Sequence, residues 1–253
     1  MPDSKLPRRL ARPTVEEAVF EVRFAPVSDS VVSLLPGILF SQLSKVYTKH
    51  VALPLATVPQ ALKDQQPELK YVQQIRLLSE GVFSIFVGDR VAGAATIAPY
   101  PGWDAFQTRI REFIKVLRDS KLIRFVERVA FKYVNILPLP PGQQLRALRA
   151  AVTVGDEPAP EEGFRLRTER NDANYKRIVE IATNAVITAT NGSQKQGLLV
   201  TLDAVRPLPK RAGSDQLTIE LATAVHDEAK KLFFSLITPE MRDSLGPEYE
   251  ASR

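Results

Sequence analysis

Apolar residues recur with two different spacings along the chain, and the spacing changes where Pro, Gly or Asn residues interrupt it. Over Val19–Phe24, apolar and charged residues alternate with a period of two, which is typical of a half-buried strand. From Trp103 to Leu117 the apolar residues recur every three or four positions, which indicates an amphipathic helix. The two patterns follow one another along the chain and predict an α+β protein, built mainly of antiparallel sheet.

The first half of the chain, residues 13–137, has patterns that predict the order β-α-β-β-β-α-β. The two predicted helices lie at 30–48 and 103–118. Gly-containing turns of the hairpin type separate the three middle strands. The predicted strands of this half are Val19–Phe24, Tyr71–Leu78, Val82–Val87, Val91–Ile97 and Phe125–Leu137.

The second half, residues 164–247, has patterns that predict four strands followed by a long amphipathic helix. Ser214 is the expected N-cap of that helix, and Thr238-Pro239 is expected to open a short final helix that Gly246-Pro247 ends. Turns are predicted at Asn171–Asn174, Thr183-Asn184 and Asn191-Gly192. The predicted strands are Phe164–Arg170, Tyr175–Ala182, Ala185–Thr190 and Gly197–Val205.

Each half is therefore expected to consist of strands followed by an amphipathic helix. Residues 1–12 are expected to form a flexible basic arm, and 248–253 a frayed tail. Residues 138–163 are rich in Pro and Gly, which favours a linker region between the halves. The pattern leaves open whether the halves share one sheet or form two domains.

The composition removes several kinds of chemistry from consideration. The chain has no cysteine and only two histidines, so disulfides, thiol nucleophiles and zinc sites of common spacing are not expected. Glycine-rich phosphate loops and nucleophile motifs are missing as well. We therefore expect no metal, no cofactor and no assignable catalytic residue. Residues 1–12 lack an apolar stretch and no window is apolar enough to span a membrane, so a cytoplasmic protein is expected.

Four polar residues on predicted strands are candidates for binding a ligand or partner. Glu17 and Glu21 lie at the first strand, and Tyr133 and Asn135 share one face of the strand that ends the first half. The competing interpretation is structural, with Glu21 solvated or paired across the sheet and Asn135 capping backbone groups. His226 precedes Asp227 on the long helix, and because adjacent helical residues do not share a face, a catalytic dyad is not expected.

Basic residues gather around one predicted hairpin, and the chain has a formal net charge of +5. Such a cluster could bind phosphates with release of counterions. The alternative is a solvated sheet face on which Glu169 and Glu180 offset the positive charge. No helix-turn-helix or RNA-binding aromatic pattern accompanies the cluster. The hairpin residues are Arg165, Arg167, Arg170, Lys176 and Arg177.

Three stretches resemble a sporadically distributed, functionally uncharacterised bacterial family. They are Pro13–Phe24, similar to that family's opening P-x-x-E-A-x-x-E-x-x-F stretch, the mid-chain Tyr133-Val134-Asn135-Ile136, and His226 to Thr238. The resemblance spans nearly the whole chain. It implies no catalytic residue, and the family's patchy distribution suggests genes carried on mobile or defence-related loci.

Three hypotheses follow for function. The first is a non-enzymatic protein-binding or accessory component, of a bacterial defence or toxin–antitoxin-type system. The second is a nucleic-acid-binding protein that uses the basic hairpin and the N-terminal arm. The third is an enzyme of unrecognised type with Glu17, Glu21, Tyr133 and Asn135 near one cleft. The sequence leaves the partner and the oligomeric state open.

Overall fold

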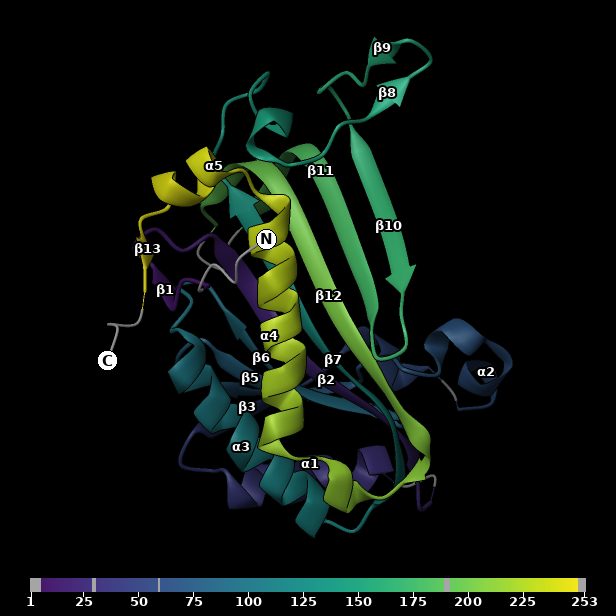
Figure 1. Ribbon diagram of the computed structural model, residues 1–253. Coiled ribbons are helices and arrows are strands. Elements are labelled where there is room, and N and C mark those ends of the chain that lie inside the picture. The colour runs from purple at the N-terminus through teal and green to yellow at the C-terminus, as the bar shows by residue number, and fades with distance from the viewer. Residues whose placement is uncertain (1–5, 29–30, 59, 189–191, 250–253) are drawn as a thin grey trace.

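The computed structural model describes residues 6–28, 31–58, 60–188 and 192–249, and its centre is one large antiparallel sheet. The nine strands follow the order β10-β11-β12-β7-β2-β6-β5-β4-β3 (Figure 1). This confirms the α+β class. The strands are β2 (Val15–Pro26), β3 (Tyr47–Ala52), β4 (Ile75–Ser79), β5 (Phe83–Val87), β6 (Val91–Ile97), β7 (Ile123–Leu137), β10 (Arg165–Asn171), β11 (Lys176–Thr188) and β12 (Gln194–Ala212).

The two halves of the chain meet inside this sheet. β7 from the first half pairs with β12 from the second, over a ladder that runs from Leu137 opposite Leu198 to Arg128 opposite Pro207. The largest core cluster also draws on both halves, because Ala204 packs with residues of β2, β6 and β7. The two halves therefore share a single continuous sheet, a point that the sequence left open.

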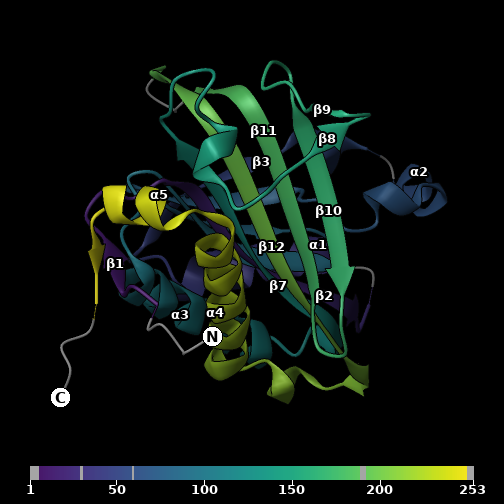
Figure 2. The same ribbon diagram turned by 45° about the horizontal axis from the view of Figure 1, so that its top comes forward.

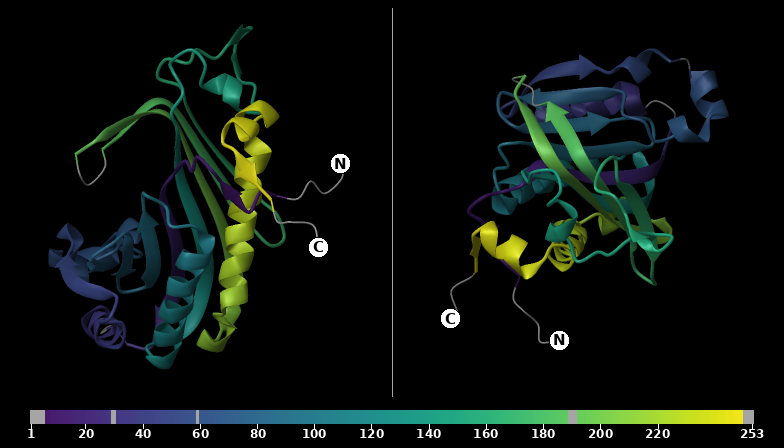
Figure 3. Two further views of the ribbon diagram at one scale, coloured as in Figure 1. Left: turned by 90° about the vertical axis from the view of Figure 1, so that its left-hand side faces the viewer. Right: turned by 90° about the horizontal axis from the view of Figure 1, so that it is seen from above.

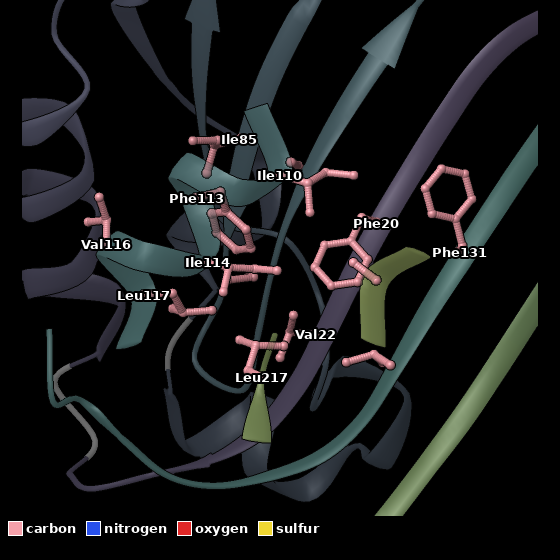
Figure 4. Packing of buried hydrophobic residues seen from close by; sticks show 14 of the residues in the cluster. Phe20, Val22, Ile85, Ile110, Phe113, Ile114, Val116, Leu117, Phe131 and Leu217 are labelled. Atoms are coloured by element: carbon pink, nitrogen blue, oxygen red, sulfur yellow. The ribbon is translucent and has the colours of Figure 1, made fainter. Parts of the chain in front are cut away.

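Three helices cover one face of the sheet, which we call the helix face: α1 (Val31–Gln42), α3 (Trp103–Asp119) and α4 (Ile219–Leu236). Figure 3 shows α4 lying along one side of the long strands. Phe20, Ile110 and Phe131 are fully buried between the two layers (Figure 4). The alternation of each strand therefore directs one set of side chains into this core and the other set to the opposite face, which we call the open face.

Two predicted strand boundaries are wrong. The turn expected at Thr183-Asn184 is a bulge inside the single strand β11, and the ladder to β12 shifts between Ala182 and Ala185. Asn184 has a positive φ of 52° there, and its amide donates to Gln144 Oε1 at 2.8 Å. A bulge and a turn can both contain a residue with positive φ, so the same residue types mark both in the sequence. The turn at Asn191-Gly192 falls partly outside the described residues.

The edge strand β3 (Tyr47–Ala52) is absent from the sequence prediction, which extends the first helix to residue 48. Only Tyr47 of this strand is buried, and the other five residues are exposed. An edge strand with solvent on both sides lacks the alternation that identifies strands, so its pattern is not recognisable. The helix ends at Gln42 instead.

The long helix begins later than predicted. Ser214 opens a short 3₁₀ turn, Ser214–Gln216, and α4 starts at Ile219. The N-cap is Thr218, whose hydroxyl accepts a hydrogen bond from the Leu221 amide at 3.3 Å. Both residues fit the N-cap preference for Ser and Thr. Thr218 is the N-cap because the first helical turn that buries side chains follows it directly. The second helix start is confirmed, since Thr238 caps α5 (Pro239–Ser244).

The N-terminal arm is not free where it is described. β1 (Arg9–Leu10) pairs with β13 (Pro247–Glu248), and the Ala11 amide donates to the Gly246 carbonyl at 2.9 Å. Arg8 forms an ion pair with Asp104 at 3.0 Å. The structure thus corrects the flexible arm for residues 6–12 and the frayed tail for Glu248, because paired backbone groups hold both segments. Residues 1–5 and 250–253 lie outside the described residues.

The region expected to be a linker, residues 138–163, packs against the end of α4. The Arg149 amide donates to the Leu236 carbonyl at 2.6 Å, and the Ala147 carbonyl accepts from the Thr238 amide at 2.9 Å. Farther along, β8 (Thr153–Val154) and β9 (Glu157–Pro158) form a small hairpin above β10 (Figure 2). The first part of this region is therefore a docked element of the fold.

Candidate binding site on the open face of the sheet

Tyr133 and Asn135 share the helix face, as the strand alternation predicts. Tyr133 is 8% exposed and its hydroxyl lies 3.2 Å from that of Tyr100. Asn135 is 3% exposed; its Oδ1 accepts from Thr14 Oγ1 at 3.0 Å and its Nδ2 donates to the Val200 carbonyl at 3.3 Å. Both side chains have hydrogen-bond partners inside the protein, and Asn135 links β7 to β12 and to the residue that precedes β2.

His226 forms the centre of an aromatic cluster next to Tyr133. Its ring stacks on Trp103 with centroids 3.6 Å apart, and Nδ1 lies 2.9 Å from Asp227 Oδ1. The sequence argument that neighbouring helical residues do not meet is therefore wrong for this pair, since the two side chains contact each other. Burial lowers the pKa of His226, and Asp227 only partly opposes that effect. The neutral, enclosed imidazole acts as a packing group.

Glu17 and Glu21 point to the other side of the sheet. β2 and β7 are neighbours, as the enzyme hypothesis requires, with Ala18 opposite Tyr133. This register puts Ala18 and Phe20 on the helix face, and hence Glu17 and Glu21 on the open face. The four candidates are therefore divided between two faces, and the structure does not bring them into one cleft.

Glu21 lies within a group of half-buried charges that we call the open-face cluster: Glu21, Arg23, Arg128, Lys132 and Asp203. They come from three adjacent strands, with Arg23 opposite Arg128 and Lys132 opposite Asp203. Glu21 Oε1 accepts from Arg23 Nε and from Arg128 Nη2, both at 2.8 Å. The side chains of Glu21, Arg23 and Arg128 are 22%, 28% and 25% exposed, so solvent reaches them but screens them incompletely.

Two atoms of the open-face cluster have unused hydrogen-bonding capacity. Asp203 Oδ1 and Arg128 Nε are buried and have no hydrogen-bond partner among the described residues. Burial raises the pKa of Asp203, whereas Arg128 and Lys132 act in the opposite direction. The acceptor and the donor lie on the same face of neighbouring strands, with Asp203 opposite Lys132 and Arg128 opposite Pro207. Each would gain from a partner that supplies the missing hydrogen bond.

Segment 53–74 adds an aromatic side chain to this cluster. The Tyr71 ring centroid lies 4.3 Å from the Arg23 guanidinium carbon, and its hydroxyl donates to Glu127 Oε2 at 2.6 Å. The segment is anchored by Lys63, whose buried ammonium group bonds to Asp89 Oδ2 at 3.0 Å. Tyr71 therefore helps to hold the Arg23 side chain in place through a cation–π contact.

The basic hairpin residues do not form one free positive surface. Arg165, Arg167 and Lys176 belong to the open face, whereas Arg170 and Arg177 belong to the helix face. Arg167 forms ion pairs with Glu169 and Glu180, and Lys176 pairs with Glu169 at 2.5 Å.

On the helix face, Arg177 contacts Asp172 and also Glu228 of α4. Of the five hairpin residues, three thus have carboxylate partners within the chain. These partners reduce the local positive charge that a phosphate backbone would meet.

Two surface hollows lie away from the open-face cluster. One, of about 790 Å³, is lined by residues of the 45–48, 79–83 and 99–101 segments, and includes Tyr100. The other, of about 350 Å³, lies between α3 and α4 and includes Asp227. Neither contains a residue proposed from the sequence as a site.

Sequence reasoning identified Glu21 but missed the rest of the open-face cluster. Arg23, Arg128 and Lys132 each occupy a charged position within an otherwise apolar strand, and that signal marks a face that is polar without being fully solvated. Asp203 carries the same signal on β12. Which of these charges meet depends on strand order, which the pattern does not give.

The described helices include none that is both long and apolar enough to cross a bilayer. No family model matches the chain, and no curated protein is similar to it in sequence at a significant level.

Proposed function

We propose that this protein is a non-enzymatic protein-binding component that takes its partner on the open face of the sheet. The observation that supports this function is the pair of unfilled, buried polar atoms in the open-face cluster, Asp203 Oδ1 and Arg128 Nε. A buried polar atom without a partner is unfavourable in the free protein. Because the side chains of Asp203 and Arg128 are only half-buried, a docked partner can draw both groups toward it, complete their hydrogen bonds and remove that penalty.

The chemistry of the cluster defines the surface that it fits. The Arg128 Nε–H group needs an acceptor such as a carboxylate, and Asp203 needs a donor such as an amide or hydroxyl group. A protein segment carries both groups within a few residues. Nucleic acid fits less well, because Glu21 and Asp203 would face its phosphates. The cluster also lies on an open sheet rather than in an enclosed pocket of the kind that small ligands occupy.

The resemblance of Pro13–Phe24 and the mid-chain Tyr-Val-Asn-Ile stretch to the sporadically distributed bacterial family extends this proposal. An accessory component of a defence or toxin–antitoxin-type system would act by binding another protein of the same system. In that setting the partner is the product of a neighbouring gene, and the complex is stoichiometric.

A photo-crosslinking experiment tests which face is used. A photoreactive amino acid is placed at Lys132 on the open face and, as a matched control, at Lys115, which is 74% exposed on α3. The tagged proteins are irradiated in the native host and the adducts are identified by mass spectrometry. We expect one protein to be captured from position 132 and not from position 115.

The same capture is then repeated with Asp203→Asn, which keeps the shape of the side chain and removes its charge. We expect the yield of the adduct to fall about tenfold, which corresponds to about 1.4 kcal/mol, while Lys115→Gln leaves it unchanged. Equal capture from both positions, or an adduct that Asp203→Asn does not weaken, would overturn the proposal. An adduct that nuclease destroys would instead favour the nucleic-acid hypothesis.

A further inference from the structure

β10 forms one edge of the nine-stranded sheet, and its outer side has no neighbour in the part of the chain that the structure describes. It pairs with β11 alone, and Figure 1 shows no strand or helix laid along its other side. All of its residues except Leu166 are exposed. Such an edge presents backbone donors and acceptors that another strand can use.

The hydrogen bonds at the two ends of β10 show which residues direct their backbone outward. The Phe164 carbonyl accepts from the Thr183 amide, and the Asp172 amide donates to the Tyr175 carbonyl. Because bonded and non-bonded pairs alternate along an antiparallel ladder, residues 166, 168 and 170 bond to β11. The backbone groups of Arg165, Arg167, Glu169 and Asn171 therefore point to the free edge.

We propose that the occupant of this edge is a second copy of the same chain, paired antiparallel to β10 about a two-fold axis at Thr168. Only this register pairs all four outward residues: Arg165 meets Asn171 of the second copy, and Arg167 meets its Glu169. Each of these contacts occurs twice by symmetry. The proposal is independent of the proposed partner on the open face.

The charges on β10 select this register over its neighbours. A shift by two residues in one direction places Arg167 opposite the same residue of the second copy. A shift in the other direction places Glu169 opposite itself. Like charges directly opposite each other are unfavourable in a sheet, and opposite charges are favourable. The Arg-Thr-Glu sequence at 167–169 is thus complementary to itself when reversed.

The position of α4 is compatible with this pairing. The helix packs mainly on β7 and β12 and reaches β11 through the ion pair of Glu228 with Arg177, so it lies over the inner strands rather than along the edge. Under a two-fold axis perpendicular to the sheet, the helices of both copies lie on the same side and the two open faces form one continuous surface. Arg170 then faces Leu166 of the second copy, where its aliphatic stem covers the half-buried leucine.

The test compares the mass of the protein in solution with that of two charge variants. Sedimentation is measured for the full chain, for Arg167→Glu and for Glu169→Arg, each at up to about 100 µM. We expect a dimer for the unaltered chain. Each variant alone places two like-charged pairs at the interface, so its dimer should dissociate at least about tenfold more readily.

An equimolar mixture of the two variants distinguishes the interface from a folding defect. In the mixed pair, the introduced Glu at 167 meets the introduced Arg at 169 of the other chain, and the native Glu169 meets the native Arg167. We expect the mixture to recover the dimer. A monomeric unaltered chain, a dimer that persists in either variant alone, or a mixture of folded variants that stays monomeric would each overturn the proposal.

Discussion

Replacing Asp203 by Asn should stabilise the protein near neutral pH, although it removes a negative charge from a cluster that contains three positively charged side chains. In the structure the carboxylate is largely buried, and its Oδ1 has no hydrogen-bond partner among the described residues. Burial raises the pKa of Asp203, and this effect exceeds the opposing influence of Arg128 and Lys132. The ionised form is therefore less favourable in the folded chain than in the unfolded chain.

The sign and size of the effect follow from linkage. An unfolded Asp has a pKa of about 3.9, and the folded value is higher, so folding becomes less favourable as the pH rises from the unfolded to the folded pKa. Above the folded pKa the penalty is constant. Asn keeps an oxygen in the same place but carries no charge, so the gain is the net cost of burying the ionised carboxylate, about 1.4 kcal/mol for each unit by which the folded pKa exceeds the unfolded one. We expect Asp203→Asn to raise the free energy of unfolding by about 1 kcal/mol near pH 7.

Urea unfolding at two pH values measures this prediction. The gain of Asp203→Asn over the unaltered chain should be present near pH 7 and should shrink as the pH falls toward about 4, where the carboxyl group is protonated in the folded chain too. A variant that is less stable than the unaltered chain near pH 7 would refute the reasoning. It would show that the attraction of Arg128 and Lys132 exceeds the effect of burial.

Three further predictions rest on other parts of the fold. Because burial lowers the pKa of His226, the unfolded chain binds the proton more readily than the folded chain does. The contribution of His226 to stability should therefore be full above about pH 6.5 and fall below it. His226→Gln should flatten this part of a plot of urea midpoint against pH. Gly93→Ala would bring a methyl group to 2.3 Å from the Phe20 carbonyl oxygen and should cost about 3 kcal/mol in urea unfolding, whereas Gly81→Ala, with its nearest atom at 3.9 Å, should be nearly neutral. Thr218→Ala removes the N-cap of α4 and should lower the unfolding free energy by about 1 kcal/mol; an unchanged urea midpoint would contradict that role.

The elements that the sequence predicted well are those that bury one face. The apolar spacing from Trp103 to Leu117 corresponds to α3, and the alternation at Val19–Phe24 lies within β2. The predictions were wrong where burial is weak or the backbone irregular, as in the exposed edge strand β3 and the bulge at Asn184. In those places the local pattern carries no record of the contacts that the segment makes in the folded chain.

The candidate site illustrates the same division. The sequence indicated that Glu21 is polar within an apolar strand and that Tyr133 and Asn135 share a face. It could not indicate that β7 lies between β2 and β12, which is what brings Arg128 and Lys132 between Glu21 and Asp203. The sequence also indicated Glu169 and Glu180 as residues that offset the charge of the basic hairpin, but it could not indicate the contact of Arg177 with Glu228 on α4.

The sequence by itself determined the class of the fold and most of its elements, because the periods of helices and strands are local properties of the chain. Tertiary structure alone decided the order of the strands and the register between them. Register assigns each side chain to one of two faces, so the pairing of Ala18 with Tyr133 buried one pair of candidates under the helices and left Glu17 and Glu21 on the open face. That assignment depends on contacts between residues more than a hundred positions apart, which local periodicity does not encode.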